Sequence, residues 1–442
     1  MMRIIQRCWA IALVVGAAIL GSSTAIAQQA AEPVVERESM SREEYRAARR
    51  VARFRRRRII VNNDGNDKAK PPYTPEDFLA SRTSALTDAQ VDSIFYCTGV
   101  PMHYTHRSRI AEQMGVGDHA DVPGKGWVAA FNEMDTDSLE IVVDWCKQND
   151  REVFWSMRMN DRHDSSSRWE YLVTDWKREN PQLLMGTEEG GLPKDFERGA
   201  KSWSMMRYDQ PEVRDRVFQV IEEVCCNYDV DGIELDFFRH PAFFTEPLKG
   251  QPTPQEKLDM MTGLLRRINS MATQVGMERG RPLLIAIRIP DSMDYCKAMG
   301  LDVPKWLEEG LVDIVTGAGY FKLEPWENLV ATGKKYDVPV YACFAIRRIE
   351  ANRNPESKAD IRVWRGEAYN AWQAGVDGIY LMNRFNPKDP MLQELGDPKK
   401  LAKLERTTGT AYYNPKLWSK PQTWVPEGLL YLKDLDAPQL SD

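Results

Sequence analysis

The run Asp231-Gly-Ile-Glu-Leu-Asp-Phe-Phe-Arg-His-Pro241 alternates apolar and acidic side chains over its central residues. Because successive side chains of a β-strand point to opposite faces, Glu234 and Asp236 share one face of the predicted strand. The apolar residues between and around them take the other face. This period of two predicts a strand with one apolar and one acidic side.

A helix is predicted immediately upstream of this strand. Pro211 suits a first helical turn, Asp209 and Glu212 have the spacing of a capping box, and valines then recur at helical spacing. A helix that leads directly into such a strand is typical of a βα repeat, in which parallel strands are covered by helices. In a closed βα barrel the acidic face points to the barrel axis, where two acids are costly unless a site uses them.

Eight segments of strand character alternate with helical segments along the chain. The strands are predicted at 58–62, 93–97, 152–158, 231–238, 283–288, 312–316, 338–342 and 377–381, and the helices at 139–148, 210–228, 254–275, 303–309, 325–336 and 360–374. This order predicts an α/β fold, a (β/α)8 TIM barrel with long βα loops and N- and C-terminal extensions. An open doubly wound sheet is the alternative, but no Gly-rich phosphate-binding turn follows the first strand.

The N-terminus has the pattern of a cleaved signal peptide. Arg3 and Arg7 precede an apolar run, which closes on the small-residue site Ala25-Ile-Ala27. The apolar run is short for a membrane span, so we expect export to the periplasm or the extracellular space. The predicted organisation is a signal peptide at 1–27, a spacer and basic helix at 28–57, the barrel at 58–399 and a C-terminal extension at 400–442.

The basic segment from Ser41 to Arg58 has two interpretations. It could contact an anionic partner or a membrane surface, or it could be a solvated helix that leads into the first strand; we favour the second. The net charge of −6 gives no support for nucleic-acid binding. The cysteines lack C-x-x-C spacing, which favours buried hydrophobic roles over a metal or redox site. The sequence predicts no cofactor and leaves the oligomeric state open.

Polar residues gather where each predicted strand ends, which is the position of active sites in these barrels. The loops after the second and third strands are also long, about forty to fifty residues each, and loops of that length are usually functional. The catalytic candidates are Asp236, Asp291 and Glu234, and the candidates for substrate binding are Arg158, Asn160, Asp161, His163, His103, Asn62, Arg288, Tyr320 and Arg384.

An exported barrel with a mouth rich in carboxyl groups and tryptophan suggests a glycoside hydrolase acting on a poly- or oligosaccharide. That chemistry needs two carboxyl groups, about 5–5.5 Å apart when one is a nucleophile and about 6.5–9.5 Å apart when water attacks. Asp236 is the first choice and Asp291 the leading second, with Glu234, Asp161 and Glu324 as reserves. Arginines in the mouth would suit an anionic sugar through bidentate hydrogen bonds.

The run Tyr228-Asp-Val-Asp231-Gly-Ile-Glu-Leu-Asp236, preceded by Asp209-Gln-Pro-Glu-Val-Arg214, resembles the glycosyl-hydrolase-like 10 family. There a similar helix leads into a D-G-I-x-x-D strand of a TIM barrel. A comparable strand occurs in the α-amylase and α-galactosidase types, whose terminal Asp is the nucleophile. The resemblance therefore implies that role for Asp236. The predicted seventh strand ends without an acid, unlike that of family-10 xylanases.

Three alternatives stay open at this point. The protein could be a non-catalytic carbohydrate-binding barrel that lacks one carboxyl group. It could be a metal-dependent hydrolase or lyase that uses His103, His106 and His163. Asp236 could also serve only as the buried partner of Arg158 or Arg288.

Overall fold

The computed structural model describes residues 39–191, 193, 203–249, 251–319, 323–344 and 360–407. The predicted signal peptide, the spacer at 28–38, Tyr320 and most of the C-terminal extension lie outside these residues. The predictions made for them therefore stay predictions.

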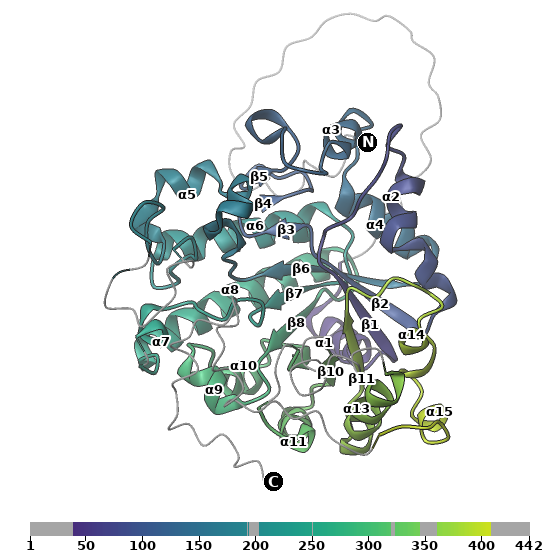
Figure 1. Cartoon of the computed structure of the whole chain (residues 1–442). Helices are drawn as coiled ribbons and strands as arrows, with labels where there is room; N and C mark the ends of the chain where they lie inside the picture. Colours follow the sequence, from purple (N-terminus) through teal and green to yellow (C-terminus); the bar gives the residue numbers. More distant parts are fainter. Residues whose placement is uncertain are drawn as a thin grey trace, which may run out of the picture.

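Eight parallel strands form a closed barrel in the order β1-β11-β10-β9-β8-β7-β6-β2, which confirms the predicted TIM barrel (Figure 1). The strands are β1 Ile59–Asn63, β2 Val91–Tyr96, β6 Glu152–Arg158, β7 Gly232–Asp236, β8 Leu284–Ile289, β9 Ile314–Gly317, β10 Val340–Phe344 and β11 Gly378–Met382. Each lies at a predicted strand, with ends that coincide or are shifted by one or two residues.

The register of β6, β7 and β8 determines which side chains meet at the mouth, the C-terminal end of the barrel strands. Asp236 at the end of β7 is paired with Arg158 of β6 on one side and with Arg288 of β8 on the other. Two residues earlier, Glu234 lies between Ser156 and Ala286. The pleat therefore places a carboxylate between two arginines at one level of the barrel and a carboxylate beside a hydroxyl at the level below.

The alternation predicted for β7 is confirmed by the way the core divides. Ile233, Leu235 and Phe237 belong to the large apolar cluster between barrel and helices. A second, smaller cluster fills the inside of the barrel and includes Phe154. A Cβ at Gly232 would overlap the Phe154 ring, so the glycine of the motif makes room for this plug below the acidic pair.

Helices surround the barrel in the βα order (Figure 1). They are α1 Arg42–Arg53, α2 Pro75–Arg82, α3 Trp127–Glu133, α4 Ser138–Gln148, α5 Asp175–Glu179, α6 Pro211–Asn227, α7 Thr245–Leu248, α8 Gln255–Glu278, α9 Met293–Ala298, α10 Val303–Glu308, α11 Trp326–Tyr336, α13 Ile361–Ala374, α14 Pro390–Glu394 and α15 Pro398–Leu401. The two long loops hold α3 with the small sheet β3 Gly99–Val100, β4 His103–Tyr104 and β5 Glu112–Gln113, and α5, respectively.

The capping box predicted for α6 is wrong. Gln210 is the N-cap of α6 and makes no side-chain capping hydrogen bond. The Asp209 carboxylate instead accepts hydrogen bonds from Arg207 at 3.0 Å and from Lys257 of α8 at 3.2 Å. Two cations thus outcompete the helix N–H groups for this carboxylate.

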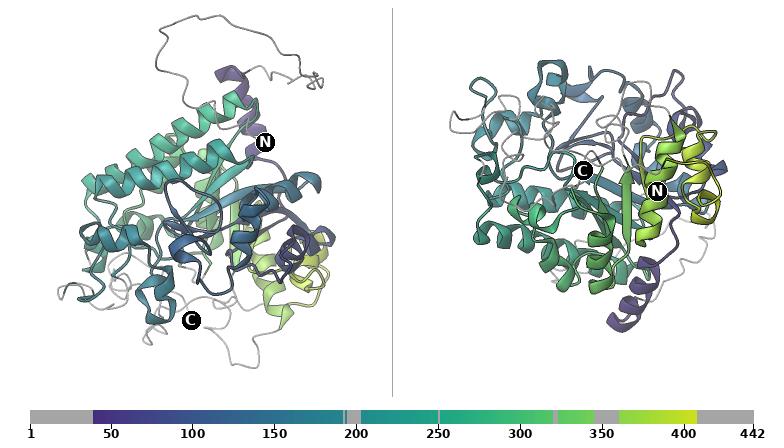
Figure 2. Two further views of the ribbon diagram at one scale, coloured as in Figure 1. Left: turned by 90° about the horizontal axis from the view of Figure 1, so that it is seen from above. Right: turned by 60° about the horizontal axis from the view of Figure 1, so that its bottom comes forward.

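The basic segment does form a helix, α1, which lies beside α8 at the N-terminal end of the barrel (Figure 2). We expected a solvated helix, but several arginines of this segment form ion pairs. Arg49 and Arg53 both form ion pairs with Asp313, at 2.8 and 2.9 Å, and Arg57 forms one with Glu152 at 2.6 Å. The segment therefore closes the base of the barrel through ion pairs.

The cysteines agree with their predicted role. All six in the described ranges are free, and five of them are buried. In the described ranges we find no helix with the length and apolar character that a membrane crossing requires.

Candidate active site

Asp236 is the most constrained carboxylate at the mouth. Its Oδ1 accepts hydrogen bonds from Arg288 Nε at 3.0 Å and from the N–H groups of Phe238 and Arg239 at 3.0 and 3.1 Å. Its Oδ2 accepts from Arg288 Nη2 at 2.5 Å. This bidentate pair fixes both oxygens, with only 3% of Asp236 and none of Arg288 exposed.

Glu234 lies directly below Asp236 and is only half satisfied. Its Oε2 accepts from Ser156 Oγ at 2.5 Å, from Tyr380 OH at 2.9 Å and, at 3.5 Å, from Asn62 Nδ2. Its Oε1 is buried without a hydrogen-bond partner. Burial, and then the negative charge of Asp236, raise the pKa of Glu234 to about 7.

Asp161 and His163 form an oriented pair at the end of β6. His163 Nδ1 lies 2.5 Å from Asp161 Oδ1, and Arg239 Nη2 lies 3.2 Å from His163 Nε2. Because a guanidinium only donates, Nε2 carries the lone pair and Nδ1 carries the proton given to Asp161. These two neighbours therefore fix one tautomer of a partly exposed imidazole.

The carboxylate of this pair is fully buried. Burial alone would raise the pKa of Asp161, but its interactions with His163 and His240 outweigh burial and hold that pKa well below the usual range. Arg158 Nη1 binds its other oxygen at 3.0 Å, and Arg158 Nη2 donates to the Asp64 carbonyl at 3.3 Å. Asp161 thus orients both His163 and Arg158.

Arg239 connects this pair to Asp236. Its backbone N–H binds Asp236 Oδ1, and its guanidinium binds His163 Nε2. The Met159 N–H also donates to the Asp236 carbonyl at 3.0 Å. Asp236 and His163 therefore belong to one mouth, at the adjacent ends of β7 and β6.

Other predicted residues have structural partners. Asp291 accepts hydrogen bonds from the N–H groups of Leu323 and Glu324, at 2.9 and 3.3 Å, just before α11. Asn160 bonds the backbone of Met206 and Ala242. Their proposed roles in catalysis and binding stay predictions.

The remaining candidates have other partners or lie outside the described residues. His103 contacts the Leu172 carbonyl at 3.2 Å, and its ring lies 4.5 Å from that of His119, tilted by 60°. Arg384 pairs with Asp389 at 3.4 Å and packs over Trp364. Tyr320 lies outside the described residues.

Two groups in the described ranges bring three metal-ligand atoms within 4.8 Å of one another. They are Asp161, His163 and His240, and Glu112, His119 and Asp175. In the first, Nδ1 of His163 carries the proton bound to Asp161, and its Nε2 accepts from Arg239. His240 Nδ1 is buried without a hydrogen-bond partner, 3.5 Å from Asp161 Oδ1. In the second, Glu112 accepts hydrogen bonds from the N–H groups of Asp175 and Trp176 and contacts the His119 imidazole.

The predicted trio His103, His106 and His163 does not form one site. His106 bonds Thr98 Oγ1 at 2.7 Å, and burial lowers its pKa to about 4. Sequence reasoning also left out the partners Ser156 and Tyr380 of Glu234. The strand register could have indicated Ser156, since it is the cross-strand neighbour of Glu234.

Neither models of protein families nor the curated proteins give a match to this chain. Among solved structures, it is similar to an α-L-fucosidase isoenzyme 2 from Paenibacillus thiaminolyticus, with 13% identity, TM-score 0.44, and 79% of this chain and 49% of that one covered. It is also similar to the PgaB glycoside hydrolase domain from Bordetella bronchiseptica, with 11% identity, TM-score 0.48, and 78% of this chain and 99% of that one covered. A thiamine phosphate pyrophosphorylase from Pyrococcus furiosus matches with 10% identity, TM-score 0.32, and 80% of this chain and 98% of that one covered.

The chain spans about half the length of the fucosidase. The similarities are too weak to assign chemistry to this chain. The function has to be argued from the residues of this chain.

Proposed function

We propose that this protein is an exported glycoside hydrolase in which Asp236 is the nucleophile. The proposal is supported above all by one observation: a buried carboxylate at the C-terminal end of a barrel strand, with both oxygens oriented by Arg288 and two backbone N–H groups. That end of the strands is where TIM barrels carry their active sites. The β7 motif also resembles the strand of the α-amylase and α-galactosidase types, which implies the same role for Asp236.

His163 is the proton-transfer group in this proposal, because its tautomer is fixed and its ring is partly exposed. Protonated at Nε2, it gives that proton to the glycosidic oxygen as the bond to C1 breaks and Asp236 bonds to C1. In the second half, a water passes a proton back to Nε2, its oxygen bonds to C1, and Asp236 leaves. Arg239 must release Nε2 for either transfer. Asp291 is less suited, since its oxygens hold loop N–H groups.

The test is Asp236→Asn in the exported chain, assayed on a panel of aryl glycosides and polysaccharides. We expect turnover to fall by about 10³-fold or more, because the amide cannot form the glycosyl ester. Asp231→Asn is the matched control, since Asp231 lies just before the same strand, at the opposite end, and pairs with Lys147 and Arg281. Unchanged turnover in Asp236→Asn would remove this residue from the chemistry.

A carbohydrate-binding barrel without catalysis is the second candidate, and the Asp236–Arg288 pair itself favours it. Arg288 binds both oxygens of Asp236, and a carboxylate paired in this way stabilises the fold but is hindered from attacking a substrate. This candidate predicts that wild-type protein binds a glycan from the panel and turns over none. Product release by the wild type would exclude it.

A further inference from the structure

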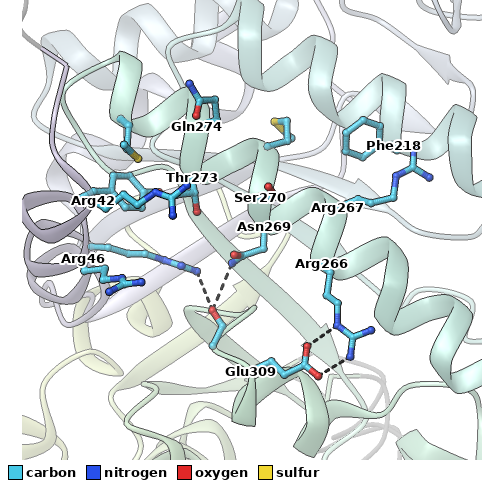
Figure 3. A pocket seen from close by; sticks show the side chains of 15 residues that line it. Arg42, Arg46, Phe218, Arg266, Arg267, Asn269, Ser270, Thr273, Gln274 and Glu309 are labelled. Atoms are coloured by element: carbon cyan, nitrogen blue, oxygen red, sulfur yellow. Dashed lines mark hydrogen bonds and ion pairs between the residues drawn. The ribbon is translucent and has the colours of Figure 1, made fainter.

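A groove of about 800 Å³ lies outside the barrel, between α1, α8 and the end of α10 (Figure 3). Five arginines line it, with one acid among them. They are Arg42, Arg46, Arg49, Arg266 and Arg267, and the acid is Glu309. The chain as a whole carries a net charge of −6, so this positive charge is a local feature.

Three of these arginines already have carboxylate partners. Arg49 binds Asp313, Arg266 binds Glu309 at 2.6 Å, and Arg267 binds Asp215 at 2.6 Å. Arg42 and Arg46 are exposed, and neither forms an ion pair with any residue in the described ranges. The uncompensated charge of the groove therefore sits on these two residues of α1.

Neither arginine helps its own helix. Arg42 is the first residue of α1, where a positive side chain opposes the helix dipole. Arg42 and Arg46 are also four residues apart, and like charges at that spacing destabilise a helix by a few tenths of a kcal/mol. An anion bound between them would relieve both penalties, which is a physical reason to expect a ligand here.

The opposite wall of the groove is polar. Ser270, Thr273 and Gln274 of α8 offer hydroxyl and amide groups across from the arginines (Figure 3). Guanidinium groups bind sulfate and carboxylate through two parallel hydrogen bonds, and hydroxyl and amide groups suit sugar hydroxyls. The volume falls within the range of about 300–1,000 Å³ typical of ligand sites.

We propose that this groove binds an anionic polysaccharide, a glycan chain that carries sulfate or uronate groups. A recessed groove can hold a glycan chain, whereas contact with a flat membrane requires a protein surface that protrudes. The groove adjoins α1 at the base of the barrel, so it is an accessory site separate from the mouth. The proposal does not depend on Asp236 being catalytic.

The test measures binding of dextran sulfate and of neutral dextran to the full chain by calorimetry. We expect the wild type to bind dextran sulfate and not dextran. Arg42→Ala/Arg46→Ala should weaken that binding about tenfold or more, because two charge-assisted contacts are lost. Arg55→Ala/Arg56→Ala is the matched control: it removes the same charge from exposed arginines of the same segment outside the groove, and it should bind within about twofold of wild type.

Three outcomes would overturn the proposal. The wild type could fail to bind dextran sulfate. The two double variants could lose affinity equally, which would indicate attraction to bulk charge. The protein could instead bind phosphatidylglycerol vesicles through Arg42 and Arg46 while ignoring the polymer, which would make the groove a lipid-headgroup site. Thermal melting of each variant shows that it is folded.

Discussion

The two ends of the barrel both bury carboxylates, but they satisfy them differently. At the base, Glu152 accepts from Arg57 at both oxygens and from Ser93 Oγ, so each oxygen has a donor. At the mouth, Glu234 has three donors on one oxygen and none on the other. The base is closed by complete pairing, and the mouth retains an unsatisfied acid.

This difference indicates what each end contributes. A fully paired buried charge is lost only at a large cost in stability, and nothing is left over for chemistry. Glu234, whose pKa burial and the Asp236 carboxylate raise to about 7, leaves one buried oxygen without a hydrogen-bond partner. We therefore expect stability to depend on the N-terminal ends of the strands, and the proposed proton chemistry on their C-terminal ends.

The largest effect is expected at the base. Arg57→Met leaves the buried Glu152 carboxylate without its guanidinium, so the free energy of unfolding should fall by about 3–5 kcal/mol. Urea unfolding measures it. Arg50→Ala is the control, because Arg50 and Asp337 form an exposed pair, and we expect no measurable loss there. If both variants unfold like wild type, the base is not the stabilising end.

At the mouth, His163→Ala should lower turnover by about 10²–10⁴-fold. The reason is loss of the proton-transfer group. On an aryl glycoside whose leaving group needs no acid, azide, a nucleophile that needs no base, should restore part of the turnover. The assay compares rates with and without azide. His119→Gln, in the neighbouring loop, is the control. A loss that azide does not restore would reduce His163 to a structural partner of Asp161.

The contrast between the two ends was only partly predictable from sequence. A period of two predicted that Glu234 and Asp236 face the barrel axis, because side-chain alternation is local. The partner of Asp236 depends on the pairing of β7 with β8, fifty-two residues apart, and the sequence left Arg158 and Arg288 as alternatives.

Long-range partners account for the rest. The local sequence pattern could not show that His103 and His163 lie in different places, because the paths of the two long loops determine where each histidine lies. Nor could it show that the arginines of α1 meet Asp313, which lies about 260 residues further along the chain. Charges on a helix surface look solvated until the fold supplies their partners.

The smallest effect concerns Glu234 and is a dependence on pH. Its pKa is about 7 in the folded protein and near 4.5 when the chain is unfolded. Between these values the folded state holds a proton that the unfolded state has released. Its contribution to stability is therefore present below pH 4.5 and lost as pH rises through 7. Glu234→Gln does not titrate, so relative to wild type it should gain about 1–3 kcal/mol between pH 5 and pH 8.

Urea unfolding of both proteins at pH 5, 6, 7 and 8 measures this gain, with the exposed Glu170→Gln as control. Asp236→Asn should shrink the wild-type pH dependence, because the charge of Asp236 is the second cause of the raised pKa. A constant difference between Glu234→Gln and wild type across these pH values would mean that Glu234 is ionised throughout. The mouth would then resemble the base, and the proposed division between stability and chemistry would fail at its most sensitive residue.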